Sequence, residues 1–330
     1  MTPVRESRRV PSRKALITGI TGFVGSHLTE SLLADGVAVA GLARAPQWAA
    51  GAEHLADRVK VHVVELSDAE GLSQIVRDAQ PTEIYHLAGL ASVPVSIREP
   101  ALAWQVNFLG SQNMYAALEQ EAPSARLLSV SSGTVYGKPP SALGPIHERT
   151  PFNPTTPYSQ SKLAADLLGL QWAHERGLQL FVVRSFNHIG PRQQGEFALA
   201  DFAQQIAAAE GGAAAVLRCG DLSVSRDFLD VRDVVRAYRT LMDHAEPGEA
   251  YNLASGETHT LQSLVDRMIA ESKKKFEIVQ EASRLRAEDP DVIRVDTTKL
   301  RRQTGWAPTI PIERTLRDVL DYCRSLRRRG

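Results

Sequence analysis

The 330-residue chain is poor in cysteine, carries no excess of charge and lacks a long apolar run. Its two cysteines, Cys219 and Cys323, offer neither a disulfide framework nor metal-ligand spacing, which predicts no metal site and a reducing compartment such as the cytoplasm. Basic and acidic residues both number 38, so the net charge is zero, which excludes nucleic-acid binding through the phosphate backbone as the main activity. No apolar run approaches the roughly 20 residues that a membrane-spanning helix needs, so no membrane span is expected.

The composition that remains is that of an ordinary globular protein. Hydrophobic residues make up 43% and charged residues 23% of the chain, and its length suits one large α/β unit or two domains. Residues 1–13 hold four arginines without the apolar block of a signal peptide, and they are predicted to be a disordered basic tail.

The first fold signal is a short apolar run, 14–19, that ends at the first of three glycines, Gly19, Gly22 and Gly25. An amphipathic segment and a second strand-like run, 37–42, follow. Strand, glycine turn, helix and strand form the opening βαβ unit of a dinucleotide-binding fold. Gly19 allows the tight turn, Gly22 lets backbone N–H groups approach a pyrophosphate, and Gly25 lets helix and strand pack closely.

Strand-like and helical segments alternate up to about residue 190, which predicts a doubly wound parallel Rossmann sheet with helices on both faces. The expected strands are 59–66, 83–87, 126–130 and 178–185, and the helices between them include 72–79 and 107–118. Residues 14–190 are therefore predicted to bind NAD(P). Residues 191–330 are predicted to form a smaller α+β substrate domain, from which 228–255 returns to the first; its expected elements are helices 198–210 and 261–271 and strands 214–218 and 276–279.

The glycine spacing G-x-x-G-x-x-G resembles that of the extended short-chain dehydrogenase/reductases, and later motifs carry the resemblance over nearly the whole chain. The family's H-L-A-A/G signature matches residues 86–89, and Glu65 stands where the family usually has an aspartate near the adenine. The resemblance therefore implies that the cofactor is bound by Gly19, Gly22, Phe23, Val24, Gly25, Glu65, Leu66, Leu87, Ala88 and Gly89, together with two catalytic residues, Tyr158 and Lys162.

The end of the second strand bears on the choice of cofactor. An NAD enzyme usually has a carboxylate there for the ribose 2′-hydroxyl, whereas this chain has Arg44. Because a guanidinium suits a 2′-phosphate, the sequence favours NADPH, with NADH as the alternative. The other interpretation of Arg44 is a solvated loop residue.

Tyr158 and Lys162 form a Tyr-x-x-x-Lys pair. Residues four apart share one face of a helix, so the phenol and the ammonium are expected to point into one cleft. A free phenol titrates near 10, and a neighbouring cation is expected to bring its pKa toward the working range. The same spacing also occurs by chance on solvated helices, but downstream of a glycine turn it predicts catalysis.

Residues 129–137 resemble the family's Ser/Thr-x-x-x-Tyr-Gly segment, which implies Ser132 as the third catalytic residue. Its hydroxyl could bond a substrate carbonyl oxygen as charge builds there. Ser131 is the alternative. Gly133 and Thr134 stand where sugar-nucleotide 4,6-dehydratases keep carboxylates, and neither can shuttle a proton, so dehydration is disfavoured.

Two motifs concern the substrate. Residues 186–193, F-N-H-I-G-P-R-Q, and 220–228, G-D-L-S-V-S-R-D-F, resemble reductases that act on GDP-4-keto-6-deoxy-D-mannose. A guanidinium in the second motif could grip the diphosphate bidentately. Residues 284–289 resemble an R-P-x-E nucleotide-binding element, with alanine for proline and aspartate for glutamate. The implied substrate-binding residues are Ser92, Val93, Ser132, Asn187, Arg226, Arg286 and Asp289.

The resemblance thus implies an NAD(P)H-dependent oxidoreductase that reduces the 4-keto group of GDP-4-keto-6-deoxy-D-mannose to GDP-D-rhamnose, with hydride delivered to C4 and a proton from Tyr158. The alternatives are a nucleotide-sugar 4-epimerase that holds NAD, a relative of GDP-mannose 4,6-dehydratase, and a cofactor-binding protein without turnover. A homodimer formed through the Tyr158 helix is implied. The sequence further predicts core positions for Trp104, Trp172 and Trp306, and a solvated basic tail over 324–329.

Overall fold

Seven parallel strands form the central sheet, in the order β11-β6-β5-β4-β1-β2-β3. The computed structural model describes residues 13–140, 143–193, 195, 197–285 and 292–329. The strands are β1 Lys14–Thr18, β2 Ala38–Ala43, β3 Lys60–Val63, β4 Glu83–His86, β5 Arg126–Ser132, β6 Leu180–Ser185 and β11 Ala250–Leu253. An order that reverses between β1 and β4 opens a crevice at the carboxyl ends of those strands, where ligands bind in such folds.

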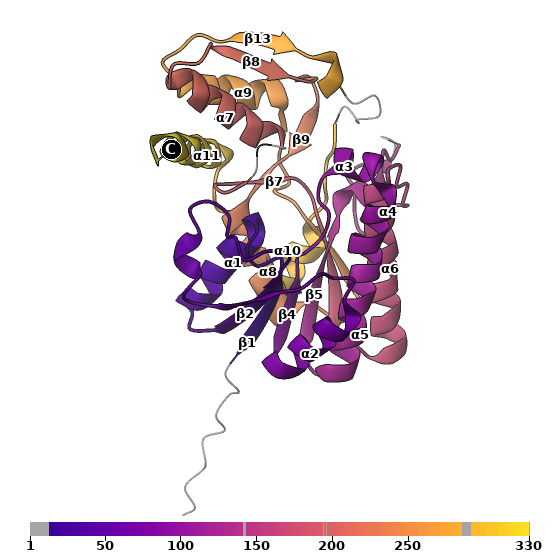
Figure 1. Cartoon of the computed structure of the whole chain (residues 1–330). Coiled ribbons are helices and arrows are strands. Elements are labelled where there is room, and N and C mark those ends of the chain that lie inside the picture. The colour runs from indigo at the N-terminus through magenta and orange to yellow at the C-terminus, as the bar shows by residue number, and fades with distance from the viewer. Residues whose placement is uncertain (1–12, 141–142, 194, 196, 286–291, 330) are drawn as a thin grey trace, which may run out of the picture.

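Helices cover both faces of this sheet (Figure 1). One face buries its apolar side chains against α1 (Phe23–Ala34), α8 (Val231–His244) and α10 (Thr298–Thr304). The other packs against α2 (Ala69–Ala79), α5 (Gly110–Glu121) and α6 (Pro157–Arg176). Because helices cover both faces of the sheet, every residue of β4 and β6 is buried.

The chain leaves the sheet after β6 and returns to it twice. Ala250–Leu253 pairs with Val182–Ser185 as β11, and α8 precedes it on the sheet's face. Leu300 and Trp306 also pack into this core, so the C-terminal part contributes more to the first domain than residues 228–255 alone.

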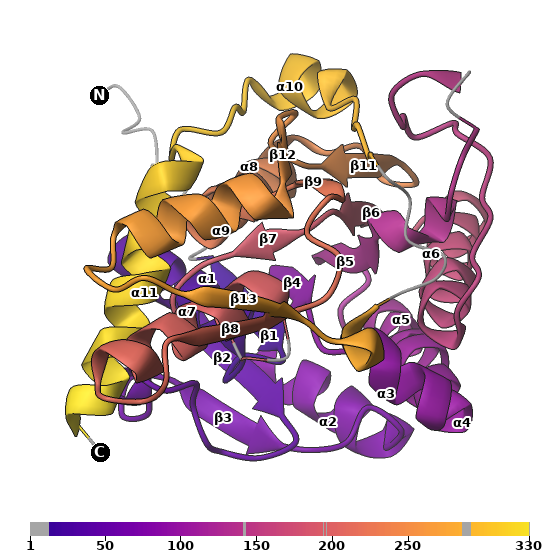
Figure 2. The ribbon, with the colours of Figure 1, turned by 90° about the horizontal axis from the view of Figure 1, so that it is seen from above.

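A second unit with its own hydrophobic core stands above the carboxyl edge of the sheet (Figure 1). Seen from above, β8 and β13 lie over β1, β2 and α1 (Figure 2). Its core joins three helices to the parallel pair β8–β13. The elements are α7 Ala198–Glu210, β8 Val216–Cys219, α9 Leu261–Ala270, β13 Glu277–Gln280 and α11 Ile312–Arg329.

Short elements connect the two units. Two small sheets pair β7 with β10 and β9 with β12. Short helices follow β2, β4, β5 and β13, and one of them, η2, is a π-helix that runs directly into α5. The bounds are β7 His188–Ile189, β9 Ser225–Asp227, β10 Leu229–Asp230, β12 Thr258–Thr260, α3 Val93–Arg98, α4 Pro100–Ala103, η1 Glu53–Leu55, η2 Trp104–Leu109, η3 Gly133–Tyr136 and η5 Ala282–Arg284.

Several sequence-based expectations differ from the structure. Arg13, predicted to belong to a disordered tail, donates two hydrogen bonds to Glu83, while residues 1–12 lie outside the described residues. The third strand ends at Val63 instead of residue 66. Trp172 and Trp306 are buried, but Trp104 is 40% exposed, so its assignment to the core was wrong. The predicted basic tail is instead the last turns of α11, where Arg324 forms an ion pair with Glu210, 114 residues earlier in the chain.

Candidate functional site

The glycine turn joins β1 to α1 at the carboxyl edge of the sheet. Gly19 has φ +72°, a left-handed conformation that glycine adopts readily. A Cβ on Gly25 would lie 2.2 Å from the carbonyl oxygen of Gly19, so α1 can approach β1 only without a side chain there. Helix α1 begins after Gly22, which has no side chain to cap the first N–H groups, and Phe23 and Val24 open the helix. These donors, together with the helix dipole, suit the pyrophosphate of a dinucleotide.

The other cofactor candidates lie along the same edge. Arg44 follows the last residue of β2 and is exposed, while Glu65 and Leu66 follow β3, the neighbouring strand. The segment after β4, residues 87–89, lies beside the glycine turn, since a Cβ on Gly19 would sit 3.2 Å from the Ala88 backbone. The structure therefore brings the predicted cofactor residues to the ends of four adjacent strands.

The predicted catalytic residues converge beside this edge. Ser132 ends β5, and Tyr158 and Lys162 lie in the first turns of α6, which starts at a capping box made by Thr156 and Ser159. The Lys162 ammonium donates a hydrogen bond to the Val130 carbonyl, 2.9 Å away.

The pKa values in this cluster have one dominant cause. Burial raises the pKa of the Tyr158 phenol, and a hydrogen bond with Ser132 acts in the opposite direction. Burial lowers the pKa of Lys162 to about 8. The net direction is upward, opposite to the lowering that the sequence predicted, and the Lys162 ammonium is hydrogen-bonded to the Val130 carbonyl. A phenol that holds its proton at neutral pH suits a proton donor.

One residue outside the predicted site supports it. Asn107, in the π-helix η2, accepts a hydrogen bond from the Leu90 amide at 2.8 Å and donates to Ser161 at 3.1 Å. A Cβ on Gly89 would lie 2.9 Å from Asn107 and 3.0 Å from the Lys162 ammonium. Both side chains therefore pack against the backbone of Gly89. The π-helix, a feature often found at functional sites, has no recognisable signal in sequence periodicity.

Thr18 and His86 tie the strand ends together. The Thr18 hydroxyl contacts His86 Nδ1 at 2.9 Å and accepts from the Ala88 amide at 3.0 Å, while His86 Nε2 contacts the Ser111 hydroxyl. Burial lowers the pKa of His86 to about 3, so the imidazole is neutral and structural. These contacts hold residues 87–89 against the glycine turn.

Besides Ser132, the substrate candidates that the structure describes form two pairs, Asn187 with Arg226 and Ser92 with Val93. The Asn187 side chain donates to the Asp227 carbonyl at 3.2 Å, which places it beside buried Arg226. Ser92 caps α3, where its hydroxyl accepts from the Val95 amide, and Val93 is the first residue of that helix. Arg286 and Asp289 lie outside the described residues.

His188 links the two sides of the crevice. Its ring stacks on Phe23 of the glycine turn, with centroids 5.9 Å apart and planes 12° from parallel. Nδ1 of His188 contacts the Phe186 carbonyl at 3.0 Å. The Phe-Asn-His motif is thereby packed directly onto the amino terminus of α1.

Gly133 and Thr134 stand where a dehydratase would keep its carboxylates, and the structure shows what surrounds them. A Cβ on Gly133 would lie 2.5–2.7 Å from the Phe186 ring, so the ring leaves no room for a carboxylate there. The Thr134 hydroxyl donates to Ser132 Oγ at 2.9 Å. The alternative catalytic serine, Ser131, has a buried hydroxyl with no partner among the described residues, whereas Ser132 acts on Tyr158.

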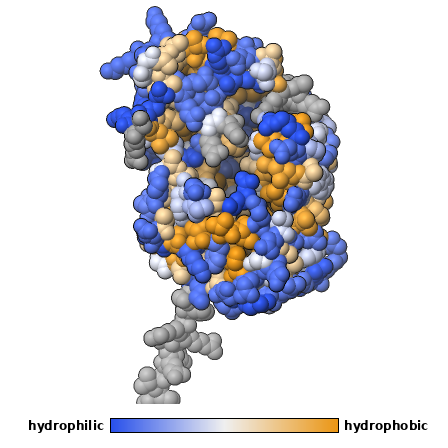
Figure 3. All heavy atoms as spheres, viewed as in Figure 1, coloured by the Kyte–Doolittle hydropathy of each residue, from blue (hydrophilic) through white to orange (hydrophobic). Residues whose placement is uncertain are grey.

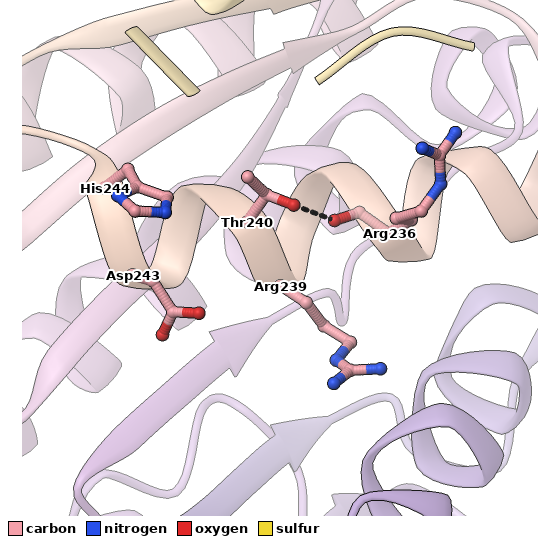
Figure 4. A pocket seen from close by; sticks show the side chains of 5 residues that line it. All are labelled: Arg236, Arg239, Thr240, Asp243 and His244. Carbon is pink, nitrogen blue, oxygen red and sulfur yellow. Dashed lines mark hydrogen bonds between the residues drawn. The ribbon is translucent and has the colours of Figure 1, made fainter. Parts of the chain in front are cut away.

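A pocket of about 240 Å³ lies on the outer face of α8 and is distinct from this crevice (Figure 4). Asp243 in its lining forms an ion pair with Arg13, just before β1, so it belongs to the amino edge of the sheet. That edge is roughly 20 Å from Ser132, the length of β5.

Within the described ranges no group of three or more His, Cys, Asp or Glu could hold a metal ion. None of the helices described there has the length and apolar character to cross a membrane.

A parallel sheet with this strand order, a glycine turn into α1 and a Ser-Tyr-Lys cluster at its carboxyl edge define an extended short-chain dehydrogenase/reductase. The family model of GDP-mannose 4,6 dehydratase matches residues 16–319. The chain therefore belongs to the GDP-mannose 4,6-dehydratase family of these oxidoreductases.

Proteins that are similar in sequence and in structure agree with this assignment. The chain is 38% identical, over 94% of its length and 96% of the relative's, to GDP-6-deoxy-D-mannose reductase of Pseudomonas aeruginosa. The structure of RMD from Pseudomonas aeruginosa complexed with NADPH matches with a TM-score of 0.84 and 37% identity, covering 95% of this chain and 99% of that one. Thermus thermophilus UDP-glucose 4-epimerase in complex with NAD matches with a TM-score of 0.84 and 30% identity, covering 94% and 99%.

Proposed function

We propose that the protein reduces the 4-keto group of GDP-4-keto-6-deoxy-D-mannose to GDP-D-rhamnose with NADPH. The observation that carries this proposal is the pairing of an intact Ser132-Tyr158-Lys162 cluster with Gly133 and Thr134, which supply no carboxylate for dehydration. The 38% identity to GDP-6-deoxy-D-mannose reductase supports the same substrate class.

The residues of the crevice fit the cofactor and the reaction. The uncapped amino terminus of α1 and the left-handed turn at Gly19 suit the pyrophosphate. Bound NADPH would supply the hydride to C4. Ser132 would donate a hydrogen bond to the carbonyl oxygen, and Tyr158 would transfer its proton there, so that the ketone becomes an alcohol. Lys162 would bind the cofactor ribose. Arg226 and Arg286 would hold the nucleotide diphosphate with a contribution from Asn187, and Asp289 would contact the nucleotide ribose.

The proposal is tested by supplying the purified protein with sugar nucleotides and following NADPH absorbance. GDP-4-keto-6-deoxy-D-mannose should be consumed with one NADPH per sugar, whereas GDP-mannose alone should stay unchanged. The corresponding UDP- and dTDP-linked 4-keto sugars test the choice of base. Formation of a 4-keto sugar from GDP-mannose would indicate a dehydratase, and interconversion of sugars without net NADPH use would indicate an epimerase.

Arg44 is proposed to select NADPH over NADH. Replacement of Arg44 by Ala should weaken NADPH binding by about 1–3 kcal/mol and leave NADH binding unchanged, because a charge-assisted contact to the 2′-phosphate is lost. Titration calorimetry with both cofactors measures this. Arg58→Ala, another exposed arginine of the same domain, is the control. Equal losses for both cofactors would contradict the assignment.

We also propose a two-fold homodimer formed through the face that carries α3, η2 and α6. Exposed apolar side chains gather there, namely Ile97, Trp104, Leu109 and Leu167. Hydrophobic residues occupy the right-hand side of the surface where Figure 1 places α3 and α4 (Figure 3). Such a patch is typical of a protein interface.

Light scattering at micromolar concentration should give the mass of a dimer. The double replacement Trp104→Glu and Leu167→Glu should give a monomer, because it puts charges into an apolar interface. Ile278→Glu, at a similarly exposed position on β13, should leave the dimer intact. A monomeric wild-type protein would contradict the proposal.

We place the reaction in the cytoplasm. Both cysteines of the chain, Cys219 and Cys323, are unpaired and buried in the second unit. Unpaired thiols are the usual state of cysteine in reducing compartments.

A further inference from the structure

Two hydrogen bonds at the end of β5 define the state of the Ser132 hydroxyl. Thr134 donates to Ser132 Oγ twice, from its hydroxyl at 2.9 Å and from its backbone amide at 3.2 Å. A serine hydroxyl can accept two hydrogen bonds and donate one. Both accepting positions are thus taken by one residue, and the Ser132 proton is left free to donate.

The hydroxyl proton of Ser132 points into the crevice. Ser132 is 7% exposed, whereas the Thr134 side chain beside it is exposed. A hydrogen bond with Ser132 favours the ionised form of Tyr158, the effect of a donor on the phenolate oxygen. The Ser132 hydroxyl therefore donates toward the position that a carbonyl oxygen would share with the Tyr158 hydroxyl.

We propose that Thr134 is a positioning residue, whose hydroxyl and amide fix Ser132 as a hydrogen-bond donor to the oxygen that gains negative charge during hydride transfer. This inference rests on the proposed reduction and deepens it. A donor oriented before the reaction needs no reorganisation as the charge develops. A hydroxyl that already accepts hydrogen bonds is also polarised toward donation, because neighbouring bonds strengthen one another.

Helix capping alone does not account for the pair. Ser132 is the N-cap of η3. An N-cap side chain needs to accept only one hydrogen bond, from a backbone amide two residues on, and the Thr134 amide donates it. The hydroxyl bond is additional. Valine has the shape of threonine and keeps the amide, so Thr134→Val removes the hydroxyl bond and retains the cap.

The first test compares Thr134→Val with Thr134→Ser. The valine variant should lower kcat about 10-fold, with little change in KM for the sugar nucleotide and in NADPH affinity, because only the orientation of Ser132 is lost. The serine variant keeps a hydroxyl and should restore most of kcat. Thr240→Val, which removes a hydroxyl bonded to the Arg236 carbonyl on α8, is the matched control (Figure 4). An unchanged kcat in Thr134→Val would overturn the proposal.

A double-mutant cycle separates positioning from a direct role of Thr134. In a Ser132→Ala background, Thr134→Val should have no further effect on kcat, since the group that it orients is gone. An equal loss of kcat in both backgrounds would overturn the proposal. The cycle can use whichever 4-keto sugar nucleotide the wild-type protein reduces.

A second readout needs no turnover and so stays informative if the proposed function fails. The ionisation of Tyr158 is followed as the phenolate absorbance difference between each protein and its Tyr158→Phe version. Loss of an oriented donor should raise the Tyr158 pKa in Thr134→Val above that of the wild type, while Thr134→Ser should match the wild type. An identical pKa in the valine variant and the wild type would overturn the proposal.

Discussion

Replacing Tyr158 by Phe should reduce kcat by about 100- to 10,000-fold while leaving NADPH binding nearly intact. The substitution removes the only proton donor proposed for the alkoxide, and general acids contribute about 10²–10⁴-fold to such reactions. Burial keeps the phenol protonated at neutral pH by raising its pKa, so the wild-type residue is ready to donate. The ring of phenylalanine retains the packing of the crevice.

Steady-state NADPH oxidation and fluorescence titration of NADPH measure the two quantities separately. Tyr251→Phe is the control, because it also removes a phenol that donates a hydrogen bond, to Gln303 at 2.9 Å, beside the segment that contacts the amino end of β6. Turnover within 10-fold of the wild type in the Tyr158 variant would assign the proton donor to another group.

Asp166→Asn should destabilise the protein by about 3–5 kcal/mol, the cost of leaving a buried charge without its partner. Asp166 lies one turn after Lys162 on α6 and accepts two hydrogen bonds from Arg184 on β6, at 2.8 and 3.0 Å. The side chains are 0% and 3% exposed. Burial acts to lower the pKa of Arg184, but hydrogen bonding and attraction from Asp166 outweigh it and raise that pKa, so Arg184 stays charged.

Urea unfolding of the two proteins measures the loss. The matched control is Glu119→Gln, which breaks the exposed ion pair with Arg176 and should cost no more than about 1 kcal/mol. If both variants unfold at the same urea concentration, the buried pair does not hold α6 in place. The same network extends to Tyr136, whose hydroxyl accepts from Arg184 at 3.0 Å, so it connects α6 to the segment that follows Ser132.

The sequence predicted the parts of this fold that depend on local patterns. The glycine turn, the alternation of strands and helices and the helix over Ala198–Glu210 all carry their signal within a few residues. Arg324 pairs with Glu210, 114 residues earlier in the chain, and the exposure of Trp104 is set by the tertiary fold, so both were assigned wrongly.

The candidate site shows the same division. The spacing of Tyr158 and Lys162 is a local signal, and the structure places both near Ser132. The contacts of Asn107 with Leu90 and Ser161 join segments 17 and 54 residues apart, which no motif reveals. The direction of the Lys162 ammonium also depends on the tertiary fold, so its effect on the phenol was not predictable from spacing.

The late return of β11 to the sheet constrains how the protein can be cut and in what order it can be built. Until residue 253 has been synthesised, β6 is an edge strand whose side chains, buried throughout the finished protein, have no neighbour on one side. The cover that α8 gives to Phe181 and Val183 is missing as well. An unpaired apolar edge invites intermolecular pairing. A fragment that ends near residue 190 should therefore aggregate, although it contains every residue of the glycine turn and of the Ser-Tyr-Lys cluster.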